Sequence, residues 1–238
     1  MLRAVLFDLD DTLLDRQASL ALFVSRQAHE RLGLPGARAR RYVDRFLELD
    51  DHGRHWIKAV YRSLYEELPL GAWTPEQLLA DYERHLPACS LPKDGALGAL
   101  EAIQSMGLQL GLVSNGKAAL QERKLRAIGI APLFDARVFP GAVGRRKPDR
   151  AIFHFACARL NRPPNQCVFV GDNPRTDIDG AVSAGLHSVY LPVHQGERCA
   201  RADAHCTRLR DLPAVIAAMQ SPGAGRRARG RVPAALER

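Results

Sequence analysis

Short apolar runs and stretches of helical apolar spacing alternate along much of the chain. Runs of this length are typical of buried strands, and five occur, at residues 4–9, 108–114, 136–139, 167–171 and 188–191. Apolar residues recur at intervals of three and four, which predicts helices, at 96–106, 118–128, 150–160, 177–184 and 209–219. The alternation from about residue 92 onward predicts an α/β fold with a doubly wound parallel sheet.

The segment between the first two predicted strands has a different pattern. Residues 17–91 contain no strand signal, and helical spacing recurs at 18–32, 40–49, 57–68 and 75–85. A crossover between parallel strands needs only about 12 residues, so we interpret residues 16–92 as an inserted, all-helical cap domain. The core domain then comprises residues 1–15 and 93–220. An insertion directly after the first strand is well placed to act as a lid.

The last residues, 221–238, have no apolar periodicity and are rich in Gly, Pro, Ala and Arg. Such composition predicts a basic, disordered tail. Its five Arg and one Glu give 5 − 1 = +4, half of the formal net charge of +8. Because half of the excess charge lies in this tail, nucleic acid is not expected as the partner of the folded part. A weak, salt-sensitive contact of the tail with polyanions stays open.

The composition also bears on cellular location. No apolar stretch approaches the ~20 residues of a membrane span, and the first three residues lead straight into a strand, so we expect no secretory signal. The five cysteines form no C-x-x-C pair, which favours free thiols in a reducing compartment. We therefore expect a cytoplasmic protein. A zinc site is a weak alternative, since the spacing of its candidate ligands matches no usual pattern: His194, Cys199, His205 and Cys206.

Two carboxylates follow the first apolar run, Asp8 and Asp10. Open α/β sheets bind their ligands just beyond the carboxyl ends of the strands, so both side chains are candidates for an active site. Two carboxylates this close are costly unless a cation or a shared proton neutralises them. The pair therefore favours a metal site.

Three further segments place polar groups at strand ends or in the loops beyond them. Ser114-Asn115-Gly116 ends the second strand and can present a hydroxyl and backbone N–H groups to an anion. Lys147 precedes Pro148, which we expect in the first turn of the next helix. Asp172 and Asp177 follow the fourth strand. Each segment could be an ordinary turn, basic loop or helix cap, but together they supply carboxylates, a hydroxyl and a cation at one edge.

In combination, these segments resemble the haloacid dehalogenase-like (HAD) hydrolase superfamily, and the insert resembles the α-helical cap of its subfamily I. The D-x-D-x-T signature of that superfamily appears as Asp8-Leu9-Asp10-Asp11-Thr12. The three other motifs appear as Ser114-Asn115-Gly116, Lys147-Pro148-Asp149 and Gly171-Asp172-Asn173-Pro174-Arg175-Thr176-Asp177. The resemblance covers all but the last ~18 residues, the part with disordered composition.

The resemblance implies catalytic roles for individual residues. Asp8 would be the nucleophile that forms an aspartyl-phosphate. Asp10 would protonate the leaving oxygen and then deprotonate the attacking water. Lys147 would bind and neutralise phosphate oxygens as part of the catalytic set.

The resemblance also implies a metal and a phosphate-binding set. Mg²⁺ would bind Asp8, the backbone carbonyl of Asp10 and Asp172. Asp177 would orient Lys147 or a metal-bound water without itself binding the metal. Ser114 and Lys147 would hold the phosphate; the phosphate-binding set would also include Thr12, which steadies the loop of Asp10, and Asn115.

The implied activity is Mg²⁺-dependent hydrolysis of a small phosphorylated metabolite, a sugar phosphate or a nucleotide. Asp10 disfavours a dehalogenase, and Asp11 makes a phosphomutase a weaker match. A phosphonatase would need a lysine in the cap, where Lys58 is the only one. The acidic motif of residues 171–177 resembles most the branch that contains pyrimidine nucleotidases and acylneuraminate phosphatases. A non-catalytic protein that binds a phospho-ligand is the alternative from another class.

Substrate specificity in such a protein would come from the cap. The candidate contacts lie at its start and in a polar loop: Arg16, His52, Arg54 and His55. The loop could also be a solvated turn between two helices. We slightly favour the turn, because nothing in the sequence indicates that the loop faces the substrate.

Overall fold

The computed structural model describes residues 1–53, 55–194 and 196–220, and the predicted tail lies outside these ranges. By its internal contacts the chain divides into two compact units. The sheet unit comprises residues 1–8, 94–115 and the described residues from 133 onward. The helical unit comprises residues 9–93 and 116–132.

The sheet unit contains one sheet of six strands, all parallel, in the order β3-β2-β1-β4-β5-β6. The strands are β1 (Ala4–Phe7), β2 (Gln109–Val113), β3 (Ala136–Val138), β4 (Cys167–Gly171), β5 (His187–Tyr190) and β6 (Ala204–His205). Every residue of the central strands β1 and β4 is buried. This explains why both appear in the sequence as continuous apolar runs. The predicted α/β fold is confirmed.

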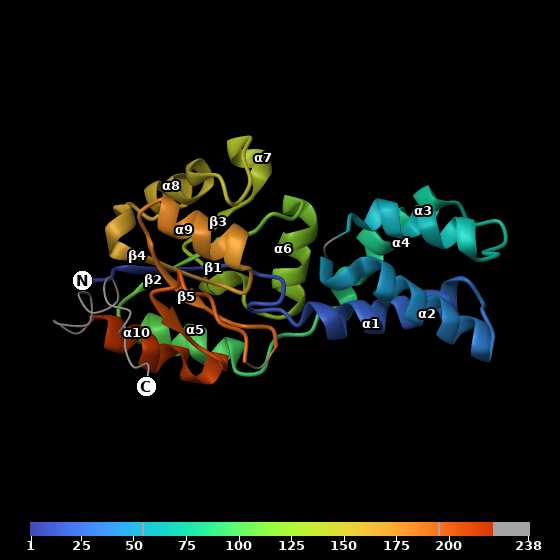
Figure 1. The fold of residues 1–238 in the computed structure, drawn as a ribbon, viewed down its shortest axis with the longest axis horizontal. Helices are drawn as coiled ribbons and strands as arrows, with labels where there is room; N and C mark the ends of the chain where they lie inside the picture. Colours follow the sequence, from blue (N-terminus) through green and yellow to red (C-terminus); the bar gives the residue numbers. More distant parts are fainter. Residues whose placement is uncertain (54, 195, 221–238) are drawn as a thin grey trace, which may run out of the picture. The chain divides into compact units, whose positions relative to one another are not determined.

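Helices cover both faces of this sheet (Figure 1). One face carries α7 (Pro140–Val143), α8 (Arg150–Arg159) and α9 (Gly180–Ser183), and the other carries α5 (Ala96–Ser105) and α10 (Leu212–Gln220). Phe153 of α8 packs edge-on against Phe169 of β4, with 5.1 Å between the ring centroids. The apolar spacing of these helices thus matches the faces that they bury.

Two helix starts differ from the prediction, and helix capping explains both. We expected Pro148 inside the first turn of a helix, but α8 begins at Arg150 and the carboxylate of Asp149 caps it, accepting from the N–H of Ala151 at 2.9 Å. We expected a single helix over 177–184, but a short helix, η6 (Pro174–Asp179), begins earlier and precedes α9. Its cap is Asn173, followed by a proline at the first helical position.

The helical unit contains α1 (Arg16–Arg26), α2 (Gly36–Asp50), α3 (Ile57–Glu67) and α4 (Pro75–His85). These four helices lie where the sequence predicts the insert. They enclose an apolar cluster in which Phe46 and Tyr61 stack edge-on, 5.3 Å apart. By contacts this unit also includes α6 (Ala118–Ala127), which follows β2 in the chain.

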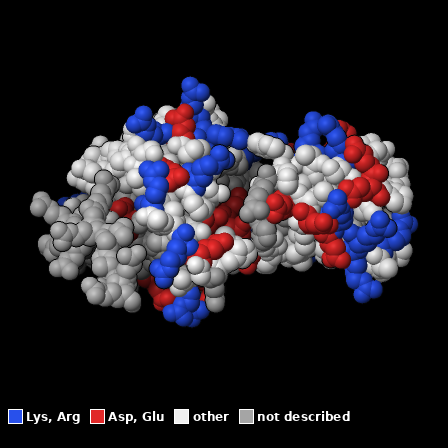
Figure 2. Space-filling view, viewed as in Figure 1, with Lys and Arg blue, Asp and Glu red and all other residues white. Residues whose placement is uncertain are grey.

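Charged side chains of both signs are mixed on the visible face of each unit (Figure 2). No basic stripe of the kind that binds nucleic acid stands out among the described residues on that face. Within the described part of the chain, every helix is too short or too polar to cross a membrane.

Candidate active site

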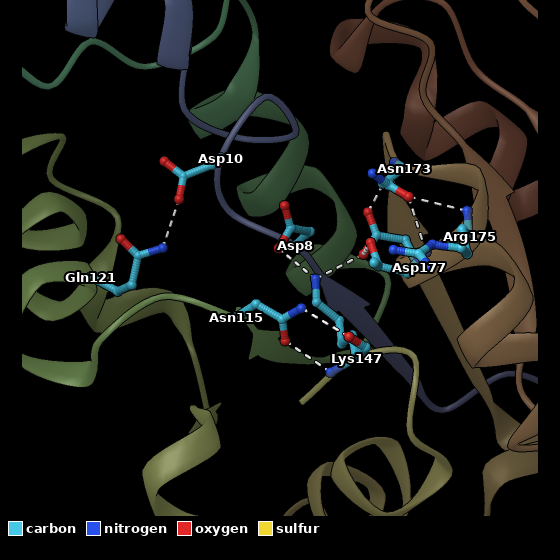
Figure 3. Close-up of polar contacts among 9 residues, drawn as sticks. Asp8, Asp10, Asn115, Gln121, Lys147, Asn173, Arg175 and Asp177 are labelled. Carbon is cyan, nitrogen blue, oxygen red and sulfur yellow. Dashed lines mark hydrogen bonds and ion pairs between the residues drawn. The ribbon is translucent and has the colours of Figure 1, made fainter. Parts of the chain in front are cut away.

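A buried lysine joins two carboxylates at the carboxyl end of the sheet (Figure 3). The Nζ atom of Lys147 lies 2.6 Å from Oδ1 of Asp8 and 2.8 Å from Oδ1 of Asp177. All three side chains are buried. Burial acts to lower the pKa of Lys147, but Asp177 and Asp8 outweigh it and raise the pKa above its usual value. Lys147 is therefore positively charged at neutral pH.

The side chain of Asn115 fixes the backbone of Lys147 (Figure 3). Its Oδ1 accepts from the N–H of Lys147 at 2.8 Å, and its Nδ2 donates to the carbonyl oxygen of Lys147 at 3.0 Å. The amide thus pairs with both polar groups of one residue, across 32 positions of sequence. These contacts indicate that Asn115 positions Lys147, and phosphate binding by Asn115 stays a prediction.

The turn after β4 sets the position of Asp177. Asn173 accepts from the N–H groups of Arg175 and Thr176, at 3.1 and 3.0 Å, and its own N–H donates to Oδ2 of Asp177 at 3.0 Å. At Gly171 a Cβ atom would lie only 2.6 Å from Cβ of Asp177, so a larger residue there would displace the carboxylate. The contact with Lys147 is the one expected if Asp177 orients that lysine.

Three carboxylates of the sheet unit gather closely enough to share a cation. Asp8, Asp172 and Asp177 each offer an oxygen within 4.8 Å of the others, the one such group of His, Cys, Asp or Glu in the described residues. Three carboxylates and the single ammonium of Lys147 leave a formal excess of two negative charges. Oxygen ligands with this excess suit a hard divalent cation. The zinc alternative at 194–206 gains no support.

The remaining motif residues follow the strand ends as expected. Ser114 is buried directly after β2, and its N–H donates to the carbonyl of Val138 at 3.2 Å. Thr12 is fully buried in the turn after β1, and its N–H donates to the carbonyl of Leu9 at 3.3 Å.

Asp10 belongs to the helical unit and is held by two donors from α6. Lys124 Nζ lies 2.8 Å from its Oδ1, and Gln121 Nε2 lies 2.7 Å from its Oδ2. Burial acts to raise the pKa of Asp10, but Lys124 and Gln121 outweigh it, and the pKa lies below its usual value. The resting form is the carboxylate.

This arrangement agrees with a sequence comparison. A model of the haloacid dehalogenase-like hydrolase family matches residues 2–185, which include every motif described above. The chain belongs to the haloacid dehalogenase-like hydrolases. The predicted family and the predicted enzyme class are confirmed.

Several characterised proteins of this kind are similar to the chain. An N-acetylmuramic acid 6-phosphate phosphatase of Pseudomonas aeruginosa is 32% identical over 207 residues, 82% of this chain and 88% of the relative. A glyceraldehyde 3-phosphate phosphatase of Methanothermobacter thermautotrophicus is 32% identical over 80% of this chain and 86% of its own length. The crystal structure of a HAD phosphatase from Thermococcus onnurineus is 26% identical, covers 90% of this chain and 98% of that one, and superposes with a TM-score of 0.65.

From the sequence, we predicted substrate contacts in this HAD hydrolase at Arg16 and in the polar loop of residues 52–55. The guanidinium of Arg16 forms two hydrogen bonds of 2.7 Å with the buried carboxylate of Asp50. His55 is exposed, whereas Arg54 and the side chain of His52 lie outside what the structure describes. Substrate contact by these four residues stays a prediction.

The polar contacts of three residues were not anticipated from the sequence. They involve the two donors to Asp10, Gln121 and Lys124, and the cap residue Asn173. The sequence places Gln121 and Lys124 in a helix after the second motif, and the spacing i, i+3 shows that they share a face. Nothing in that spacing says which loop the face contacts.

Proposed function

We propose that this HAD hydrolase is an Mg²⁺-dependent phosphatase that cleaves phosphomonoesters of small metabolites. The observation that carries the proposal is the buried Lys147 between Asp8 and Asp177, next to the carboxylate of Asp172. A fixed cation beside a carboxylate nucleophile suits phosphoryl transfer, which depends on positioning and charge neutralisation. The phosphatases similar to this chain support the same class of reaction.

In the first half-reaction, a carboxylate oxygen of Asp8 attacks phosphorus and forms an aspartyl-phosphate. The bond from phosphorus to the ester oxygen breaks, and that oxygen takes a proton from the protonated form of Asp10, so that an alcohol leaves. In the first turnover Asp10 takes this proton from solvent, because its resting form is the carboxylate. Lys147 holds Oδ1 of Asp8 and so fixes the carboxylate. An ammonium has three N–H donors; its described contacts use two, and the third suits a phosphate oxygen.

In the second half-reaction, water attacks the phosphorus of the aspartyl-phosphate. Asp10 takes a proton from that water, the bond to Asp8 breaks and inorganic phosphate leaves. The carboxylate form of Asp10 that its lowered pKa favours is the form this step needs. The proton that Asp10 takes up is then available for the next leaving group, so protons balance over the cycle.

The carboxylates fit a divalent cation: Asp8 and Asp172 would be its side-chain ligands, and the backbone carbonyl of Asp10 would be a third ligand. When bound, Mg²⁺ supplies charge neutralisation for the phosphate and relieves repulsion among the carboxylates. Asp177 is better suited to hold Lys147, because both of its oxygens accept hydrogen bonds within its own unit.

Sugar phosphates are the substrate class that we favour. The two curated relatives described above, whose names specify N-acetylmuramic acid 6-phosphate and glyceraldehyde 3-phosphate, each cover at least 80% of this chain. A pyrimidine 5'-nucleotidase of Escherichia coli is 34% identical, but over only 45% of the chain. The nucleotide alternative therefore has the weaker support.

The test is hydrolysis of p-nitrophenyl phosphate and a panel of sugar phosphates and nucleotides by the purified protein. We expect turnover with Mg²⁺, loss of turnover in EDTA with recovery on adding excess Mg²⁺, and a loss of at least about 100-fold in Asp8→Asn. Asp211→Asn, which changes a half-buried carboxylate of the same unit that pairs with Arg208, is the matched control. Turnover that survives EDTA or persists in Asp8→Asn would contradict the proposal.

A further inference from the structure

Two polar side chains of α6 reach a carboxylate in the first catalytic motif. Gln121 and Lys124 donate to different oxygens of Asp10, at 2.7 and 2.8 Å. Both donors are buried, with only 1% and 5% of their surface exposed. Burying a lysine is costly unless its charge is paired, and here Asp10 pairs it.

Helix geometry explains how one helix supplies both donors. Residues three apart lie on the same face of an α-helix, so Gln121 and Lys124 approach Asp10 together. On the other side, the turn that holds Asp10 is anchored by Leu9 and Leu13, which are fully buried. The N–H of Leu13 donates to the carbonyl of Leu9 at 2.9 Å. Both partners of the contact are thus attached to well-packed backbone.

The second motif leaves room for this contact. A Cβ atom on Gly116 would lie 2.5 Å from Cδ and 2.6 Å from Nε2 of Gln121. Real Cβ atoms do not approach other atoms so closely, so any larger residue at 116 would push the amide of Gln121 aside. A glycine at this position therefore does more than form a turn: it admits the side chain that binds Asp10.

We propose that Lys124 and Gln121 are positioning residues for Asp10, which hold its carboxylate by both oxygens in the orientation used for proton transfer. This inference rests on the proposed function, and it assigns roles to two residues outside the four motifs. Neither side chain needs to touch the substrate. Their effect is to remove the rotational freedom that a carboxylate in a surface turn would have.

Holding Asp10 in this way is compatible with its chemistry. A carboxylate offers about four lone-pair sites, and the two donors occupy two of them. Each oxygen can therefore keep its hydrogen bond and still take up or release a proton. The side-chain hydrogen bonds described for Gln121 and Lys124 go to Asp10, and the lysine that contacts Asp8 is Lys147, so loss of the two α6 donors should leave the attack by Asp8 intact.

A substrate with an acidic leaving group separates the attack by Asp8 from the steps that need proton transfer by Asp10. p-Nitrophenolate leaves without protonation, so kcat/KM for p-nitrophenyl phosphate reports attack by Asp8, whereas hydrolysis of the aspartyl-phosphate needs Asp10 as a base. Lys124→Met and Gln121→Met keep side-chain length and remove the donors. We expect kcat to fall at least about tenfold with kcat/KM within about threefold, and a burst of p-nitrophenol equal to the enzyme concentration. With phenyl phosphate, whose leaving group is more basic, kcat/KM should fall as well.

Two variants control for structure. Lys124→Arg keeps a cationic donor and should restore most of kcat. Arg126→Met removes a positive charge from the same helix at a residue that is 68% exposed and paired with Glu122, and should leave both constants unchanged. If kcat and kcat/KM for p-nitrophenyl phosphate fall together in Lys124→Met, or neither falls, the positioning role is wrong. If the wild-type protein itself has no Mg²⁺-dependent turnover, the proposed function fails and this inference fails with it.

Discussion

At the scale of single residues, the site is organised around the charge of Lys147. A buried ammonium is stable only if anions and donors replace its lost hydration, and Asp8 and Asp177 do this at 2.6 and 2.8 Å. The ring of Phe169 lies under Nζ, with 5.2 Å to its centroid, and adds a cation–π contact. The same contacts fix the positions of the two carboxylates, so the ammonium and the carboxylates stabilise each other.

Removing this cation should therefore cost stability as well as activity. Lys147→Met keeps the size of the side chain but leaves the carboxylates of Asp8 and Asp177 buried without it. We expect the free energy of unfolding, from urea titration at pH 7 with EDTA, to fall by about 3–5 kcal/mol. The difference in unfolding free energy between wild type and Lys147→Met should become smaller as the pH falls, because protonated carboxyl groups carry no charge for a cation to neutralise. In wild type, the raised pKa of Lys147 keeps its stabilising charge through the whole neutral range.

An exposed lysine provides the comparison. Lys117 pairs with Glu83, and 73% of its side-chain surface is exposed. Surface pairs are worth less than about 1 kcal/mol, so Lys117→Met should shift the unfolding midpoint little. Equal destabilisation by the two variants would show that Lys147 is not stabilised in the way described.

Residue chemistry could be predicted from the sequence where motif and strand end coincide. Asp8, Ser114 and Asp172 each follow a strand directly, so parallel topology alone brings them to one edge. Gln121 and Lys124 could not be placed, because their partner depends on how α6 packs and not on its own periodicity. The contacts of the Asn115 amide with the backbone of Lys147 also could not be predicted, because they join loops 32 positions apart.

At the scale of elements, short capping interactions decide where the catalytic turns begin. Asp149 starts α8 one residue beyond Pro148, and Asn173 starts η6 four residues before Asp177. Apolar periodicity predicts the strands and the middle of each helix, because these are the parts that pack. It does not predict the exact starts, which depend on side-chain hydrogen bonds to orphan N–H groups.

A cap substitution at Asn173 should affect catalysis as well as stability. Asn173→Ala removes the acceptor of two N–H groups at the start of the helix that ends just beyond Asp177. We expect a loss of about 1 kcal/mol in unfolding free energy. We also expect kcat/KM for p-nitrophenyl phosphate to fall about tenfold, the equivalent of 1.4 kcal/mol, because Asp177 then holds Lys147 less firmly.

The matched control is a cap in the helical unit. Thr74 caps α4 in a reciprocal pair of hydrogen bonds with Gln77, at 3.3 and 2.9 Å. Thr74→Ala should lose a similar stability of about 1 kcal/mol with kcat/KM within about twofold. If both variants lower kcat/KM equally, the loss reflects general loosening and not the position of Asp177.

At the scale of the whole molecule, the described residues form separate apolar clusters within each of the two units. The cluster of the helical unit includes Phe46 and Tyr61, and the cluster of the sheet unit includes Phe153 and Phe169. The sequence predicts both, through its switch from strand and helix alternation to helical spacing alone. It does not predict that α6 belongs with the helical unit, because that depends on tertiary contacts. One such contact is the hydrogen bond of 2.9 Å from Arg123 to the carbonyl of Glu83.

Two matched substitutions test whether each core stabilises its own unit. Phe46 and Phe153 are both fully buried, and each stacks edge-on with one ring, at 5.3 and 5.1 Å. Truncating a buried Phe to Ala costs about 3–5 kcal/mol, and local opening follows the part of the structure that loses its packing. In hydrogen exchange, Phe46→Ala should lose amide protection mainly in α1–α4, and Phe153→Ala mainly in β1, β2 and β4. If both variants lose protection uniformly over all these elements, the two units unfold together. The prediction that each apolar cluster stabilises mainly its own unit would then be wrong.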